Sequence, residues 1–179
     1  MLMDALIVIA VIVVAFVIIV TSRPAAFRVA RTATIRAPAQ DVFAHVNDFR
    51  KWGAWSPYEK LDPAMKKTYE GTPAGTGTVY SWAGNRNAGE GRATITESRP
   101  GELVRIRLDF VKPFAGTSIA EFDFTPEGDR TAVTWSLVGE NNFMCKAVGV
   151  FVSMDKMCGR QFEAGLADLK KAVESEVKP

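Results

Sequence analysis

The sequence is poor in the residues that build metal sites, disulfides and hydrolase centres. His45 is its only histidine, and Cys145 and Cys158 are its only cysteines. One histidine excludes the HExxH zinc motif and every metal site that needs two histidines, and it leaves only His45 for a Ser-His-Asp triad. The cysteine spacing matches no common zinc motif, and two cysteines on one helix cannot form a bridge within it. We therefore expect no metal, no cofactor and no disulfide.

The sequence also lacks an excess of either positive or negative charge. The 179 residues contain 22 Lys and Arg against 20 Asp and Glu, a formal net charge of +2. Such a balance excludes a nucleic-acid-binding protein that works through charge alone, so we expect no nucleic-acid partner. The length predicts about one domain. Nothing in the composition indicates an oligomeric state.

What the chain has in excess is a long apolar run near its start. Residues 5–20 are apolar without a break, and residues 2–22 would form a helix of about 31 Å, close to the ~30 Å hydrocarbon core of a bilayer. A cleaved signal peptide is the main alternative, although no Lys or Arg precedes the run and no small-x-small site follows it directly. A buried core helix is a third possibility. We predict a transmembrane anchor over residues 1–22 and a linker over 23–26.

The charges flanking this segment indicate an orientation. Four arginines follow it and no Lys or Arg precedes it. The positive-inside bias then places the domain in the cytoplasm on a single-pass anchor. An anchored domain outside the cytoplasm stays open as the alternative, because the last two arginines also fit a folded strand. The four arginines are Arg23, Arg28, Arg31 and Arg36.

The rest of the chain, residues 27–174, alternates in the manner of an antiparallel sheet with one apolar face. Residues 27–36 form the first predicted strand, and Pro38 and Asp48 then suit the starts of two short helices. Turn residues rich in Gly, Pro and Asn separate six further predicted strands. These six lie near residues 66–69, 78–82, 92–97, 103–110, 118–125 and 131–138.

A long helix is predicted over residues 143–174, followed by a tail over 175–179. Apolar or small side chains recur along it every three or four residues, the pattern of a helix laid over a sheet. The stripe consists of Phe143, Ala147, Phe151, Met154, Cys158, Phe162, Gly165 and Leu169. One helix cannot fill the concave side of a curved sheet, so we expect a cavity between the two, with room left by Gly165 and Ala147.

Four stretches of the chain resemble a known family. They are ATIRAPAQDVFAHVNDFRKWGAWSP (33–57), GTVYSWAGNRNAGEGRATITESRP (77–100), LDFVKPFAGTSIAEFDFTPEGDRTAVTW (108–135) and GENNFMCKAVGVFVSMDKMCGRQFEAGLADLKK (139–171). Together they resemble the polyketide cyclase/dehydrase branch of the START-like, or SRPBCC, superfamily. The resemblance implies an α+β helix-grip fold, with a curved antiparallel sheet of about seven strands wrapped on the C-terminal helix. It also implies a hydrophobic ligand pocket, but no common set of catalytic residues.

We therefore predict a membrane-anchored domain that binds a hydrophobic small molecule or lipid between the helix and the sheet. The predicted ligand-binding residues are Trp52, Trp55, Trp82, Ile106, Phe122, Trp135, Phe151, Met154, Cys158 and Gln161. Two alternatives stay open, a cyclase- or dehydratase-like enzyme and a non-catalytic interaction module of the envelope or of stress responses. An enzyme needs an acid or base at the pocket, and no candidate has a partner at a recognisable spacing, so no catalytic residue is predicted. The candidates are His45, Glu97, Asp109 and Asp168.

Overall fold

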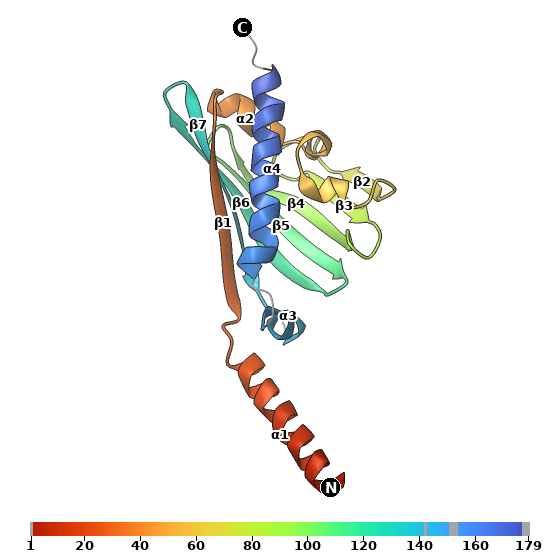
Figure 1. The fold of residues 1–179 in the computed structure, drawn as a ribbon. Helices are drawn as coiled ribbons and strands as arrows, with labels where there is room; N and C mark the ends of the chain where they lie inside the picture. Colours follow the sequence, from red (N-terminus) through yellow and green to blue (C-terminus); the bar gives the residue numbers. More distant parts are fainter. Residues whose placement is uncertain (1, 142, 151–153, 177–179) are drawn as a thin grey trace.

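The chain is an apolar N-terminal helix followed by one curved sheet that carries a long C-terminal helix (Figure 1). The structure is a computed structural model, and it describes residues 2–141, 143–150 and 154–176. The elements in chain order are α1 (Leu2–Thr21), β1 (Ala26–Ile35), α2 (Ala39–Val46), the 3₁₀ turns η1 (Phe49–Ala54) and η2 (Pro57–Lys60), β2 (Lys66–Glu70), β3 (Val79–Ala83), β4 (Glu90–Arg99), β5 (Leu103–Lys112), β6 (Gly116–Glu127), β7 (Arg130–Glu140), α3 (Phe143–Gly149) and α4 (Met154–Glu176).

All seven strands form a single antiparallel sheet in the order β1-β7-β6-β5-β4-β3-β2. Neighbours in the chain are therefore neighbours in the sheet except at β1, which pairs with the last strand from Ala26 opposite Glu140 to Ile35 opposite Thr131. Alternating side chains fall on two different faces, as the period of a strand requires. The predicted helix-grip fold is confirmed.

The inner face of the sheet carries the apolar set and packs under α4. Val29 and Ile35 of β1 are buried there, whereas the outer face carries ion pairs such as Arg105 with Glu121, at 2.6 Å. Arg31 is a charged residue on the inner side. It binds Asp155 at 2.8 Å and Glu163 at 2.7 Å, both on α4, and so fastens the helix to the first strand.

The C-terminal helical segment is divided, where the sequence pattern predicted one helix. α3 ends at Gly149 and α4 begins only at Met154. Gly149 and the β-branched Val150, which lies in a turn, are weak helix formers, and this accounts for the end of α3 at this place. The break lets α3 leave the sheet and lie beside the end of α1, where Val20 is buried (Figure 1).

The centre of the core is a stack of aromatic rings around Trp135. Its indole lies nearly parallel to the ring of Phe162 with centroids 4.1 Å apart, and Phe122 covers the other side at 4.8 Å. Gly165 of α4 allows this close approach, because a Cβ there would lie 2.8 Å from Cζ3 of Trp135. The expectation that Gly165 leaves room is therefore wrong: the ring fills the space.

Candidate functional site

An enclosed cavity of about 330 Å³ lies between α4, η2 and the inner face of the sheet. Its walls are mostly aromatic and aliphatic side chains from strands β3 to β7 and from the start of α4. They include Trp82, Ala93, Leu108, Phe110, Ala120, Trp135, Leu137, Met157, Cys158 and Phe162. The cavity exists because the curved sheet extends further than one helix can cover, so that α4 closes only part of the concave side. Its volume is near the lower end of the range of about 300–1,000 Å³ for small-molecule sites.

The structure brings together four of the ten residues predicted to bind a ligand. On the cavity wall are Trp52, Trp82, Trp135 and Cys158. Three lie in the core behind the wall, and these are Trp55, Ile106 and Phe122. Gln161 is half-buried on α4, away from the wall. Phe151 lies outside the described residues, as does the side chain of Met154.

Two polar atoms on residues of the cavity wall have no hydrogen-bond partner among the described residues. They are the indole Nε1 of Trp135 and the hydroxyl Oγ of Ser56, both buried. The other three tryptophans each donate their indole N–H to a backbone carbonyl, and these are Trp52, Trp55 and Trp82. A buried donor without a partner costs free energy, commonly about 1–3 kcal/mol. Both residues line the cavity, but these two atoms have almost no accessible surface, so a bound molecule would reach them only after a small shift of the side chains around them.

Nε1 of Trp135 is placed by the stack around the ring. Phe122 and Phe162 cover both faces of the indole, and Cζ3 faces Gly165. Cζ3 and Nε1 are on opposite edges of an indole, so the N–H edge lies away from the helix backbone at Gly165. An oxygen of a ligand could accept a hydrogen bond from this edge if the side chains that cover Nε1 moved aside while the stack stayed in place.

A carboxylate and a tyrosine form a second polar feature of the wall. The hydroxyl of Tyr80 donates to Oε1 of Glu59 at 2.5 Å, and Lys67 forms an ion pair with Oε2 of the same carboxylate. Only 7% of the Glu59 side chain is exposed. Burial, and then the hydrogen bond to Glu59, raise the pKa of Tyr80, so its hydroxyl stays protonated at neutral pH. The sequence analysis missed this pair because Glu59 and Tyr80 are 21 residues apart and no local pattern joins them.

The acid–base candidates considered from the sequence lie elsewhere. Asp168 binds Lys60 at 2.6 Å, a hydrogen bond that lowers the pKa of Asp168. Asp109 pairs with Arg107 on the outer face of the sheet, and its pKa is also lowered. The described residues that line the cavity do not include Glu97, Asp109 or His45. Burial raises the pKa of the Cys158 thiol on the wall, which keeps it neutral and unreactive.

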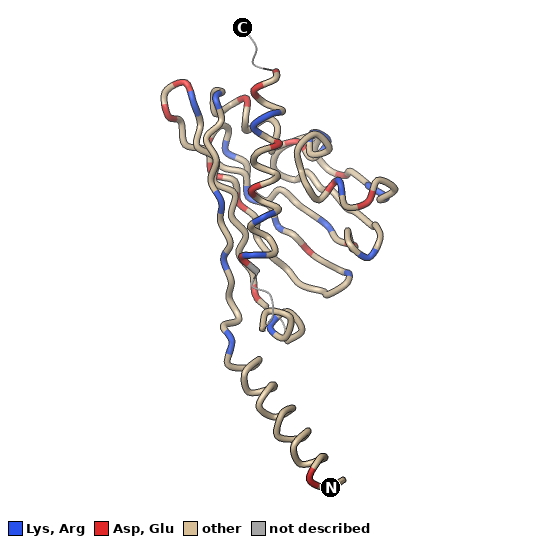
Figure 2. The backbone as a smooth tube through the Cα atoms, in the orientation of Figure 1, with Lys and Arg blue, Asp and Glu red and all other residues tan. Residues whose placement is uncertain are grey.

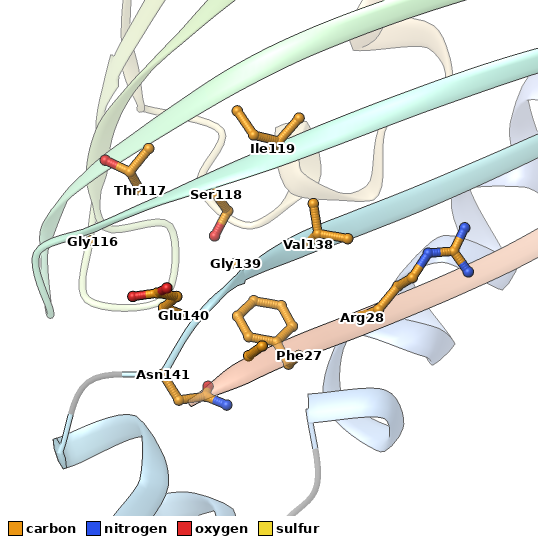
Figure 3. Close-up of a pocket in the computed structure, with 11 residues that line it drawn as sticks. Phe27, Arg28, Gly116, Thr117, Ser118, Ile119, Val138, Gly139, Glu140 and Asn141 are labelled. Atoms are coloured by element: carbon orange, nitrogen blue, oxygen red, sulfur yellow. The ribbon is translucent and has the colours of Figure 1, made fainter. Parts of the chain in front are cut away.

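A second, more open hollow of about 920 Å³ surrounds the ends of β1, β6 and β7. Figure 3 shows the ring of Phe27 and the hydroxyl of Ser118 on either side of Gly139, with Asn141 beyond them. Phe27 and Ser118 also line the enclosed cavity. These two side chains therefore border both hollows, at the end of the sheet nearest α1.

Comparisons with known proteins agree with this architecture. A family model described as polyketide cyclase/dehydrase and lipid transport matches residues 26–174. No curated protein sequence matches the chain. Among solved structures, the chain is similar to a protein of unknown function, SA2116, from Staphylococcus aureus, with a TM-score of 0.64, 10% identity and coverage of 88% of this chain and 99% of that one.

Two further structures share the fold. TTHA0849 from Thermus thermophilus has a TM-score of 0.60 and 16% identity, with 85% of this chain and 100% of that chain covered. DynU16, from the dynemicin biosynthetic locus, has a TM-score of 0.58 and 15% identity, with 83% of this chain and 48% of that chain covered. At these identities the likeness shows the fold alone.

Proposed function

Because the chain belongs to the polyketide cyclase/dehydrase and lipid transport family, we propose that it binds a hydrophobic small molecule or lipid in the cavity under α4 and is held at a membrane by α1. The enclosed, mainly apolar cavity of about 330 Å³ is the observation that carries the proposal. The ligand-binding set we propose is Trp52, Ser56, Trp82, Trp135 and Cys158, with the domain spanning residues 27–174.

The polar atoms of the wall narrow the class of ligand. A saturated hydrocarbon would leave both the Trp135 N–H and the Ser56 hydroxyl unpaired. A ligand with an apolar body and one accepting oxygen, such as a polycyclic ketone or a fatty acid, would fill the space and bind at least one of them. The small volume favours one ring system or one acyl chain over a two-chain lipid.

The anchor is supported by the length and composition of α1. Leu2–Thr21 is long and apolar enough to cross a membrane, and the domain does not bury it. A signal sequence near the N-terminus has the same features. We favour the anchor because no charge or helix-breaking residue interrupts residues 5–20.

A cavity-filling substitution tests the ligand site. Ala120→Leu adds three carbons to a side chain on the wall that is 4% exposed, so it should weaken binding of 9-fluorenone at least tenfold. Overpacking should cost no more than about 1–3 kcal/mol of stability. Quenching of tryptophan fluorescence in the detergent-solubilised full chain measures binding, and circular dichroism reports folding.

Ala132→Leu is the matched control, because Ala132 lies on the neighbouring strand β7 with its side chain on the outer face. It should leave binding unchanged. Equal affinity of both variants and the unmodified protein for fluorenone would show that the cavity does not bind such ligands, as would a failure of any apolar probe to bind.

A cyclase- or dehydratase-like enzyme is the second candidate, favoured by one observation. Glu59 and Tyr80 place a carboxylate and a neutral phenol, joined by a hydrogen bond, on the wall of the same cavity. A carboxylate can remove a proton and a phenol can donate one to a developing oxyanion. If the protein catalyses such a step, Glu59→Gln should lower the turnover of a bound polyketide-like substrate by about 10²-fold or more while ligand affinity changes little. No difference in turnover would leave binding as the whole function.

A further inference from the structure

One end of the domain is tied closely to α1. Four residues separate Thr21 from Ala26, so these two residues can lie no more than about 18 Å apart. Antiparallel register brings Glu140 beside Ala26, and Gly139 beside Ser118 of β6. The ends of these strands, α3 and the β5–β6 loop at residues 113–115 therefore lie at the end of the domain nearest the anchor (Figure 1).

Exposed large apolar side chains gather at this end. Outside α1, the described residues include seven of them, and six belong to the end of β5 and its loop, to α3 or to the start of α4. We call these six the membrane face: Val111, Phe114, Phe143, Met144, Val148 and Met157. They are 42–53% exposed. Single exposed apolar residues are ordinary, but clustering of nearly all of them at one pole indicates an interaction surface.

Charge is distributed along the same axis. Basic residues near the anchor come from the linker, from the start of β1, from the β3–β4 loop and from α3, and they are Arg23, Arg28, Arg86 and Lys146. The opposite pole, at the β6–β7 turn and the end of α4, carries charges of both signs (Figure 2): Glu127, Asp129, Glu174 and Glu176 lie there together with Arg36 and Arg130. Basic residues next to a bilayer are attracted to anionic headgroups, at about 1 kcal/mol each. These basic residues would therefore attract the apolar end of the domain toward an anionic membrane.

The cavity reaches the same end. Phe110, Lys112 and Pro113 beside the β5–β6 loop line it, and so does Met157 of the membrane face. Phe27 and Ser118, at the ends of β1 and β6, also border both the cavity and the open hollow (Figure 3). A molecule leaving the cavity in this direction would reach the region where the anchor enters the bilayer.

We propose that the membrane face rests on an anionic lipid bilayer, with α3 and the β5–β6 loop among the headgroups, and that ligand passes between cavity and bilayer through this end. The inference rests on the proposed anchor and deepens the proposed function, since it names the bilayer as the surface from which the ligand comes. An apolar ligand would then exchange without crossing water. Burial of α3 and the loop would remove the cost of exposing six large apolar side chains.

Depth measurements on the full chain test the docking. Both native cysteines are replaced by alanine, and single cysteines are introduced as Phe114→Cys, Met144→Cys and, at the far pole, Asp129→Cys. Each carries an environment-sensitive nitrobenzoxadiazole label, and the proteins are reconstituted into phosphatidylcholine/phosphatidylglycerol vesicles. We expect spin-labelled lipids to quench the labels at 114 and 144 at least fivefold more strongly than the label at 129. Equal quenching at all three positions would overturn the docking.

Transfer measurements test the passage. Phe114→Asp combined with Met144→Asp should slow the transfer of dansyl-undecanoic acid from vesicles to the reconstituted protein by about tenfold or more, since two apolar contacts with lipid are replaced by charges that repel anionic headgroups. The affinity for the same probe in detergent solution should not change. Equal transfer rates with and without the two substitutions would overturn the passage through this end.

The results separate this inference from the proposed function. Protein that fails to float with the vesicles would refute the anchor, and the docking with it. Protein that floats but keeps all three labels in water would refute the docking alone. Embedded labels, together with a failure of the unsubstituted protein to bind dansyl-undecanoic acid, would support the docking and refute both ligand binding and ligand passage.

Discussion

A Trp135→Ala variant should lose about 3–5 kcal/mol of unfolding free energy, a large part of the 5–15 kcal/mol typical of a domain. Trp135 is 3% exposed and is stacked between Phe122 and Phe162, so truncation leaves a void that two rigid rings and the backbone at Gly165 can close only partly. Urea unfolding of the full chain in detergent, followed by far-UV circular dichroism, measures the loss.

Trp82→Ala is the comparison within the same cavity. Trp82 is only half-buried and stacks on one side with Tyr80, so its loss should cost clearly less than that of Trp135. Equal destabilisation by the two substitutions would contradict a core centred on Trp135.

Trp135→Phe separates the ring from its N–H group. Phenylalanine preserves the stack but removes the unpaired donor, so stability should fall much less than in the alanine variant. Affinity for 9-fluorenone should fall roughly two- to tenfold, the value of one hydrogen bond of about 0.5–1.5 kcal/mol. Affinity for fluorene, which lacks the carbonyl, should not fall. A parallel loss for both compounds would show that the indole contributes shape and no hydrogen bond.

Charged residues in the middle of α1 should release the protein from membranes. Ile12 and Val13 lie near the centre of the segment, and the domain does not cover their side chains. An Ile12→Arg/Val13→Arg variant adds about 5–7 kcal/mol to the free energy of insertion, at 2.5–3.5 kcal/mol for each arginine. The unmodified chain should stay in the pellet after carbonate washing of membranes, whereas the variant should appear in the supernatant.

Ile12→Ala/Val13→Ala controls for the substitution itself and should remain in the pellet. Sequencing the N-terminus of the mature protein distinguishes a membrane anchor from a cleaved signal sequence. A soluble unmodified protein that begins near Ala25 would identify α1 as a cleaved signal sequence. In that case no anchor would hold the membrane face at the bilayer.

Much of the fold was predictable because it depends on local periodicity. The alternation of Val104, Ile106 and Leu108 fixes which face of β5 points inward, and glycines mark the turns. The pairing of β1 with β7 was not predicted, since no pattern in either strand identifies its partner across about a hundred residues.

The cavity wall was less predictable, for a geometric reason. Periodicity assigns a residue to a face but does not say whether that part of the face lies over core or over empty space. Ile106 and Leu108 share one face of β5, yet Ile106 is buried in the core and Leu108 lines the cavity. Trp52 and Trp55 differ in the same way within one 3₁₀ turn and its cap. At Gly165 the helix packs directly against Trp135 and Pro57. The sequence pattern does not show such close contacts, so it does not show where the helix leaves space above the sheet.

The pairing of the first strand with the last also determines when the sheet can form during synthesis of the chain. β1 has one neighbour in the sheet, β7, and the residues opposite Ala26 and Ile35 are Glu140 and Thr131. During synthesis, β1 must therefore wait for its partner until about a hundred further residues have left the ribosome. Such long-range closure is slow, and it leaves an unpaired strand edge available to other chains in the meantime. A chain that stops before Arg130 cannot complete the sheet, so the nascent protein should remain sensitive to protease until β7 has emerged.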